Sequence, residues 1–141
     1  MALVFYSVVR RHMKWTPRFT RVDAQTPLPF ELALTEGETA VGWYRNPPPH
    51  ENSVLVFTSN AIWVGEKGAF ERVAMSDIVG LDSPRKKEGV EGLLVHTKRG
   101  PCFMRACGSF GPHGNSKDFI SLMMVLRAVI ASVASTARFV N

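Results

Sequence analysis

The sequence predicts an α+β domain that is mainly β: a bent antiparallel sandwich or partial barrel of six to seven strands, capped by one long C-terminal amphipathic helix. Two observations predict this fold class. From residue 34 to residue 107, short apolar and β-branched segments alternate with turn residues, which is typical of antiparallel strands. After Gly108, apolar residues recur at three- and four-residue spacing, which is the period of a helix. One helix cannot cover both faces of a sheet, so we expect it to plug the open end of a bent one.

Turn signals bound the expected strands. Glu36-Gly37-Glu38 precedes the first strand, and Asn46-Pro47-Pro48-Pro49 ends it because proline cannot donate to a strand ladder. Ser59-Asn60 and Glu66-Lys67-Gly68 indicate turns, and Lys98-Arg99-Gly100 has a hairpin signature. The expected strands cover residues 39–45, 54–58, 62–64, 70–73, 78–81, 92–97 and 102–107.

A Ser-Asp pair, Ser76-Asp77, interrupts the strand-like stretch RVAMSDIVGLDS at residues 72–83. Ser and Asp side chains bond to their own nearby backbone and therefore favour turns. We interpret residues 74–77 as a corner between two strands, with a functional carboxylate at Asp77 as the alternative.

The C-terminal helix is expected to begin after Asn115 or Ser116, either of which can act as its N-cap, and to run to about Arg138. Repeated alanines favour the same state. Its apolar face comprises Phe119, Leu122, Met123, Leu126, Val129, Ile130 and Val133.

The basic charge of the chain is concentrated near its start. Of the 17 Lys and Arg residues, five lie within residues 1–21, and none of the 12 Asp and Glu residues does. We therefore treat residues 1–30 as a basic N-terminal arm, followed by a domain over residues 31–141. Residues 3–9 fit either a strand or a short helix. Because the excess charge is in the arm rather than on the folded body, the sequence argues against nucleic acid as a partner.

Five segments together resemble the pleckstrin-homology (PH) superfold, and more closely the bacterial PH-like domains. They read LTEGETAVGWY, SVLVFTSNAIWV, FERVAMSDIVGLDS, GLLVHTKRGPCFMRAC and KDFISLMMVLRAVI. The likeness covers about residues 31–135. It implies an interaction scaffold rather than an enzyme. Phosphoinositide-binding members use Lys and Arg in the loop after the first strand, where this chain has RNPPPHENS with Arg45 as its one firm cation, so that ligand is not expected.

We accordingly expect a non-enzymatic protein-interaction module, with an inhibitor or immunity-type protein that masks a protein partner as one specific form. The alternative is a peripheral adaptor that binds an anionic membrane surface through the basic arm. Trp43 and Tyr44 point to opposite faces of one strand, so one of them is expected to face outward and can serve as an interface anchor. The candidate partner-binding residues are Arg10, Arg11, Lys14, Trp15, Arg18, Arg85, Lys86, Lys87, Lys98 and Arg99.

The residues give little support for catalysis, cofactors or metals. Cys102 and Cys107 should point to opposite faces of one strand, so we expect neither a chelate nor a disulfide. No nucleophile motif accompanies the histidines, and GSFGPHGNS lacks the Gly-Lys-Ser/Thr of a phosphate-binding loop. A cleft lined by His96, Asp77 and Cys107 would revive an enzymatic reading.

The same features set the expected location. No apolar run approaches the length of a membrane helix, and the charges of the first residues follow the apolar stretch instead of preceding it as in a secretory signal. Two cysteines give no disulfide framework. We expect a cytoplasmic protein, with a peripheral position at the inner membrane as the alternative.

Overall fold

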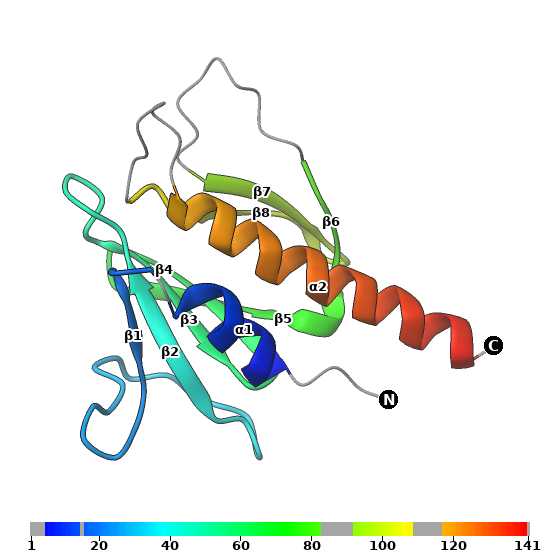
Figure 1. The fold of residues 1–141 in the computed structure, drawn as a ribbon, viewed down its shortest axis with the longest axis horizontal. Coiled ribbons are helices and arrows are strands. Elements are labelled where there is room, and N and C mark those ends of the chain that lie inside the picture. Colours follow the sequence, from blue (N-terminus) through cyan, green and yellow to red (C-terminus); the bar gives the residue numbers. More distant parts are fainter. Residues whose placement is uncertain (1–4, 15, 83–91, 109–116, 141) are drawn as a thin grey trace.

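The computed structural model of the chain describes residues 5–14, 16–82, 92–108 and 117–140 (Figure 1). The elements are α1 (Phe5–Met13), β1 (Phe19–Arg21), β2 (Ala40–Arg45), β3 (Ser53–Thr58), β4 (Ala61–Glu66), β5 (Ala69–Ala74), the short 3-10 helix η1 (Met75–Asp77), β6 (Ile78–Leu81), β7 (Gly92–Thr97), β8 (Gly100–Arg105) and α2 (Lys117–Val140).

The strands form two antiparallel sheets, one of five strands in the order β1 to β5 and one of three strands in the order β6 to β8 (Figure 1). The prediction of a mainly β α+β fold with a C-terminal helix is confirmed. The described strands form two open sheets rather than a closed barrel. They number eight instead of six or seven, because β1, from the predicted arm, pairs with β2 through Phe19 opposite Tyr44.

Two hairpin turns follow directly from the sequence. Lys67 and Gly68 join β4 to β5 with φ angles of 52° and 85°. Positive φ at both central residues is the conformation that matches the twist of a two-residue hairpin. Lys98 and Arg99 join β7 to β8, with Thr97 opposite Gly100. The hairpin predicted at Lys98-Arg99-Gly100 is therefore confirmed.

The corner predicted at residues 74–77 is also confirmed, with a different role for its carboxylate. Helix η1 turns the chain from β5 into β6 and buries Met75, while Ile78 is buried at the start of β6. The Asp77 side chain faces Arg99, at 4.0 Å from Oδ2 to Nε, instead of bonding to its own backbone. The Asp77 carbonyl accepts a 2.9 Å hydrogen bond from the Lys98 amide.

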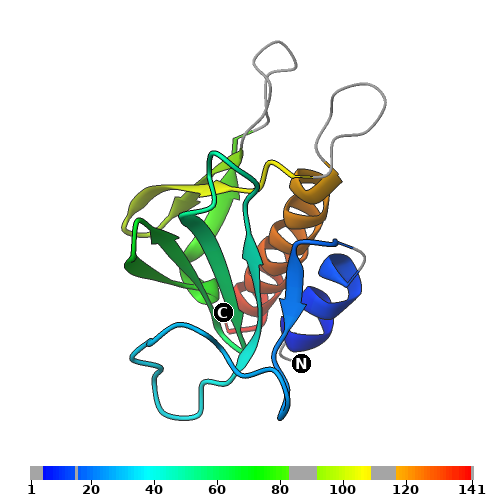
Figure 2. The ribbon, with the colours of Figure 1, turned by 90° about the vertical axis from the view of Figure 1, so that its left-hand side faces the viewer.

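The main core lies between the inner faces of the sheets and the two helices. Helix α2 packs against α1, β6 and β7, and Figure 2 shows α1 and α2 side by side. The expected apolar face of α2 is confirmed: Phe119, Leu122, Leu126 and Val129 are buried, and Met123, Ile130 and Val133 pack partly buried against them. Strand and helix both fitted residues 3–9, and the described part of that stretch belongs to α1, which buries Val8, Val9 and Met13 in the same core.

A second apolar cluster covers the other face of the five-stranded sheet. The segment between β1 and β2 places Leu28, Phe30, Leu32 and Leu34 against Trp43, Val54, Val56, Trp63 and Phe70. Every residue of β3 is therefore buried, which explains the continuous apolar run VLVF at its centre. Tyr44 and Trp43 do lie on opposite faces, but Trp43 is half-buried under this segment.

Candidate functional site

One sheet face carries exposed apolar side chains on all three of its strands. It is the face of β6, β7 and β8 turned away from the main core, here called the outer face. Val79, Leu94 and Phe103 are 52%, 37% and 42% exposed, and Leu94 lies directly opposite Phe103. Their neighbours Leu93 and Met104, one position away on the same strands, are buried. Alternation along the strands thus separates a core face from an apolar face in contact with solvent.

Charged groups lie beside and between these apolar side chains. The Arg105 guanidinium lies 5.3 Å from the centre of the Phe103 ring. On the β6 side Leu94 has Asp82 as its neighbour, because the Asp82 amide donates to the Leu94 carbonyl at 3.0 Å. His96 Nε2 lies 2.8 Å from Asp82 Oδ1, so this polar pair lies between Leu94 and Val79. An apolar centre with a polar rim is the arrangement seen in protein–protein interfaces.

The other described sheet faces are covered. The inner faces pack on α1 and α2, and the segment between β1 and β2 covers the five-stranded sheet from outside. Elsewhere in the described residues, the exposed large apolar side chains are Tyr6 on α1 and Ile120 and Met124 on α2. The outer face therefore holds half of the exposed large apolar side chains that the structure describes.

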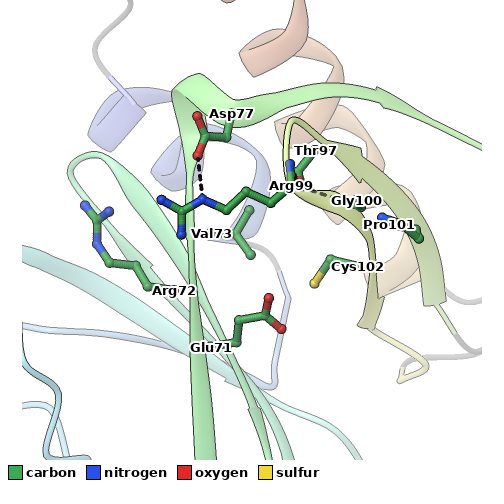
Figure 3. A pocket seen from close by; sticks show the side chains of 9 residues that line it. All are labelled: Glu71, Arg72, Val73, Asp77, Thr97, Arg99, Gly100, Pro101 and Cys102. Carbon is green, nitrogen blue, oxygen red and sulfur yellow. Dashed lines mark hydrogen bonds and ion pairs between the residues drawn. The ribbon is translucent and has the colours of Figure 1, made fainter.

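A groove runs between β5 and β8, the neighbouring edges of the two sheets (Figure 3). It consists of two adjoining hollows of about 290 and 390 Å³ that share Glu71, Pro101 and Cys102. The Glu71 and Cys102 side chains point into the space between the strands (Figure 3). We call this the edge groove. Phe103 lines it and also belongs to the outer face, so the two surfaces are continuous.

The Cys102 thiol and the Glu71 carboxylate both lie in the edge groove. Burial raises the pKa of the Cys102 thiol, and the Glu71 charge raises it further. The thiol is therefore held in its neutral form, which is the less nucleophilic one. The groove is lined by carboxylates and guanidinium groups, and its thiol is not an activated nucleophile.

Buried polar groups form networks that hold the fold together. The Glu38 carboxylate accepts hydrogen bonds from Thr58 Oγ1 at 2.5 Å, Trp63 Nε1 at 3.1 Å and the Thr35 amide at 2.9 Å, and Arg72 Nε lies 3.3 Å away. Burial on its own raises the pKa of Glu38, but these hydrogen bonds outweigh it and lower the pKa to about 2. Glu38 therefore stays ionised and ties the segment before β2 to β3, β4 and β5.

A second network of hydrogen bonds joins β2 to the start of α2 and to the chain after β8. The Tyr44 phenol donates a 2.7 Å hydrogen bond to Asp118 Oδ2 on α2, and the Gly108 amide donates a 3.0 Å bond to the same phenol oxygen. Burial, followed by the bond to Asp118, raises the pKa of Tyr44. A Cβ at position 108 would collide with both Asp118 and Tyr44, so only glycine fits there.

Asn46 joins the two sheets in the same way. Its Nδ2 donates to the carbonyls of Ser53 and Arg105, both at 3.0 Å, and its Oδ1 accepts from the Cys107 amide at 3.0 Å. Donor and acceptor are both used, which is the usual state of a buried amide side chain. These networks give Glu38, Asn46, Ser53, Thr58 and Asp118, which are buried polar residues, a structural role.

The structure brings three of the predicted basic residues together. Arg10, Arg11 and Lys14 line a shallow hollow of about 280 Å³ on the exposed side of α1, with Tyr6 and Ser7. The Arg10 guanidinium lies 5.2 Å from the Tyr6 ring centre, and its NH1 donates to the Tyr6 hydroxyl at 2.5 Å. The opposite side of α1 is buried, so these cations form its solvent face.

The remaining predicted residues do not join that hollow. Arg18 is exposed between α1 and β1, with its side chain beside Gly108. Lys98 and Arg99 form the turn between β7 and β8, and Arg99 lines the edge groove. Trp15, Arg85, Lys86 and Lys87 lie outside the described residues.

The three residues that would have indicated an enzymatic cleft lie apart. His96 pairs with Asp82 on the outer face, Cys107 is buried beside Asn46, and Asp77 lines the edge groove. Cys102 and Cys107 are not joined by a disulfide. In the part of the chain that the structure describes, no group of three His, Cys, Asp or Glu side chains is placed to hold a metal ion.

Neither the outer face nor the edge groove was predicted from the sequence. Alternation at Leu93-Leu94-Val95 did carry a signal for the outer face, because an apolar residue stands at a position where a solvated strand face has a polar one. The groove carries no such signal, because β5 and β8 are brought together only by the fold.

Among the described helices, none combines the length and the apolar character needed to cross a bilayer. Comparisons of the chain with protein families, with curated proteins and with solved structures found no match.

Proposed function

We propose that the chain is a protein-interaction module of PH-like fold that docks a protein partner on its outer face. The observation that carries the proposal is the exposure of the cross-strand pair Leu94 and Phe103, with Val79 also exposed on the neighbouring strand β6. Both faces of the five-stranded sheet are covered, whereas this apolar face is open to solvent. Exposed large apolar side chains flanked by polar groups typically mark a site of association.

The arrangement of the strands supports the PH-like part of the proposal. Strands β2 to β5 follow one another in a single antiparallel sheet, β6 to β8 form a second, and α2 follows. A meander of six to seven strands closed by one C-terminal helix is what the sequence resemblance implies. Helix α1 and strand β1 are additions to that set.

The energetics favour a protein as the ligand of the outer face. An aromatic anchor such as Phe103, once buried in an interface, contributes through its large apolar area, and Leu94 and Val79 extend that area. The Arg105 guanidinium and the Asp82–His96 pair give the rim both signs of charge. A rim of this kind sets orientation and specificity more than affinity.

The test compares three tagged baits in a lysate of the source organism: the unaltered chain, Leu94→Asp and the control Ile120→Asp. Ile120 is exposed on α2, away from the outer face. A stoichiometric protein retained by the unaltered chain and by Ile120→Asp, but lost with Leu94→Asp, supports the proposal. Equal retention by all three baits, or no stoichiometric protein on any of them, contradicts it.

An inhibitor or immunity-type role is a more specific form of the same proposal. A module of this kind would cover a working surface of its partner instead of recruiting it. The experiment is to measure the activity of the purified partner with and without the chain at equal concentration. Loss of activity that Leu94→Asp restores supports masking, and unchanged activity in the complex rules it out.

A second candidate function is association with an anionic membrane surface through α1. The hollow lined by Arg10, Arg11 and Lys14 favours it, since residues 1–21 contain no acidic residue to oppose these cations. Each basic residue near an anionic bilayer contributes about 1 kcal/mol.

Cosedimentation with vesicles tests this second candidate. The double variant Arg11→Glu/Lys14→Glu is expected to lower binding to phosphatidylserine vesicles by at least about tenfold. Lys67→Glu, at the exposed β4–β5 turn, is the matched control and should bind like the unaltered chain. Equal binding to neutral phosphatidylcholine vesicles, or no effect of the double variant, excludes α1 as the membrane contact.

A further inference from the structure

The edge groove is walled by two strand edges. The antiparallel pairing of β4 and β5 alternates, so that successive residues of β5 direct their backbone groups toward β4 and away from it. The Met75 amide donates to the Asn60 carbonyl on the β4 side. Counting back along the β4–β5 register, the N–H and C=O groups of Phe70, Arg72 and Ala74 point away from β4.

The same reasoning applies to β8. The Leu94 carbonyl accepts a bond from the Asp82 amide on the β6 side of β7. Leu93, Val95 and Thr97 therefore direct their backbone groups toward β8, and the backbone of Phe103, opposite Leu94, points away from β7. A strand edge with backbone donors and acceptors directed outward is a template for one further strand.

One end of the edge groove is closed. The Lys98 amide bonds to the Asp77 carbonyl at 2.9 Å, and the Arg99 guanidinium lies 4.0 Å from the Asp77 carboxylate (Figure 3). These contacts tie the β7–β8 turn to η1. The hollow lined by Glu66, Ala69 and Phe103 lies further along β5 and β8 from this tie. An extended chain can thus lie along β5 with its end directed toward the Asp77–Arg99 pair.

The charges lining the groove leave one carboxylate for a ligand. Arg72 points to the other side of β5, where its Nε lies 3.3 Å from Glu38, and Arg99 pairs with Asp77 (Figure 3). Glu66 Oε1 accepts a 2.6 Å hydrogen bond from Ser53. The exposed Glu71 carboxylate points into the groove toward Cys102 (Figure 3). An inward charge on a strand edge opposes pairing with an uncharged or acidic strand and favours a basic one.

We propose that the edge groove binds an extended segment of a protein partner, which adds to β5 as a further strand and places a Lys or Arg side chain against Glu71. Strand addition derives its affinity from main-chain hydrogen bonds and its specificity from alternate side chains. The inference rests on the proposed function and deepens it, because Phe103 belongs to both surfaces. A partner docked on the outer face would continue around β8 into the groove.

Selection from a phage-displayed library of random linear peptides against the purified chain tests the proposal. Enriched peptides are expected to share one Lys or Arg within a short β-branched or apolar stretch. Bound peptide should slow amide hydrogen exchange at Phe70, Arg72 and Ala74. No enriched peptide, or peptides that protect amides elsewhere, would overturn the proposal.

Charge reversal gives the matched comparison. Glu71→Lys should weaken binding of the selected peptides by about tenfold or more, because the Lys or Arg of the peptide then meets a positive charge instead of the Glu71 carboxylate. Glu36→Lys makes the same change at an exposed carboxylate before β2, outside the groove, and should leave the affinity unchanged. Equal loss in both variants would mean that only net charge matters and would contradict the assigned site.

Two measurements separate binding in the edge groove from docking on the outer face. Leu94→Asp alters the outer face but not the groove lining, so it should weaken the whole partner and spare the selected peptides. If Leu94→Asp abolishes partner binding and no peptide is enriched, docking on the outer face is supported and peptide binding in the edge groove is contradicted. If peptides bind along β5 while Leu94→Asp leaves partner binding unchanged, the groove is supported and docking on the outer face is contradicted.

Discussion

Leu94 and Phe103 are direct partners across β7 and β8, and both side chains stand exposed on the outer face. Cross-strand apolar pairs of this kind contribute about 0.2–1 kcal/mol to a sheet. Leu94→Ser and Phe103→Ser are therefore each expected to change the free energy of unfolding by no more than about 1 kcal/mol. Urea denaturation measures this directly.

The buried neighbour on the same strand is the control for this prediction. Leu93 is 1% exposed, so Leu93→Ala should cost about 2–5 kcal/mol through lost burial and the cavity it leaves. If Leu94→Ser were as destabilising as Leu93→Ala, the outer face would be part of the folding core rather than a surface available for a partner.

Glu38 is expected to make stability depend on acid pH. Its pKa of about 2 in the folded chain lies below its ordinary value of 4.5, so the ionised form stabilises the fold. The unfolded chain binds the proton more tightly, and this stability is fully present above about pH 4.5 and is lost as the pH falls toward 2. Urea denaturation as a function of pH should show the loss in the unaltered chain.

Glu38→Gln should flatten that pH dependence and lower stability at neutral pH by about 3 kcal/mol, because the bonds from Thr58, Trp63 and Thr35 lose their charged acceptor. Glu36→Gln alters an exposed carboxylate two residues away and serves as the control. A steep acid transition that persists unchanged in Glu38→Gln would assign the effect to other carboxylates.

Tyr44→Phe is expected to lower the free energy of unfolding by about 1–3 kcal/mol. The change leaves the buried Asp118 carboxylate without the phenol donor and the Gly108 amide without its acceptor. Tyr6→Phe removes a hydroxyl from an exposed ring and should cost less than about 0.5 kcal/mol. Equal stabilities of the two variants would show that the Tyr44–Asp118 bond does not hold α2 to β2.

Phe30→Ala should loosen the segment that covers the five-stranded sheet. Phe30 packs against Trp43 and Phe70, at ring-centre distances of 6.3 and 5.4 Å. We expect a loss of about 2–4 kcal/mol and faster cleavage at Glu31 and Glu36 by a protease that cuts after glutamate. Unchanged cleavage rates relative to the unaltered chain would contradict the packing of this segment.

Sequence patterns predicted the elements that are formed by residues close to one another in the sequence. The period of Phe119 to Val133 gave the α2 face, and the turn residues at 67–68 and 98–99 gave two hairpins. The corner at Asp77 was also predictable, although its carboxylate faces Arg99 because the β7–β8 turn folds back onto η1.

Features that depend on distant contacts were not predictable. The sequence of residues 3–9 fitted both a strand and a helix. The helix α1 is favoured because it packs Val8 and Val9 into the core beside α2. Nothing local indicates that Phe30 covers Trp43, or that Asn46 bridges Ser53 and Arg105. The edge groove likewise arises only when β5 and β8, which lie in different sheets, are brought side by side.

Site-specific photocrosslinking tests the central claim most directly. The photoreactive residue p-benzoylphenylalanine is placed at Leu94 or Phe103 on the outer face, and at Ile120 or Met124 on α2 as controls, in cells of the source organism. We predict one discrete protein adduct from positions 94 and 103 and none from positions 120 and 124. Adducts from the α2 positions alone, or from none of the four, would contradict docking on the outer face.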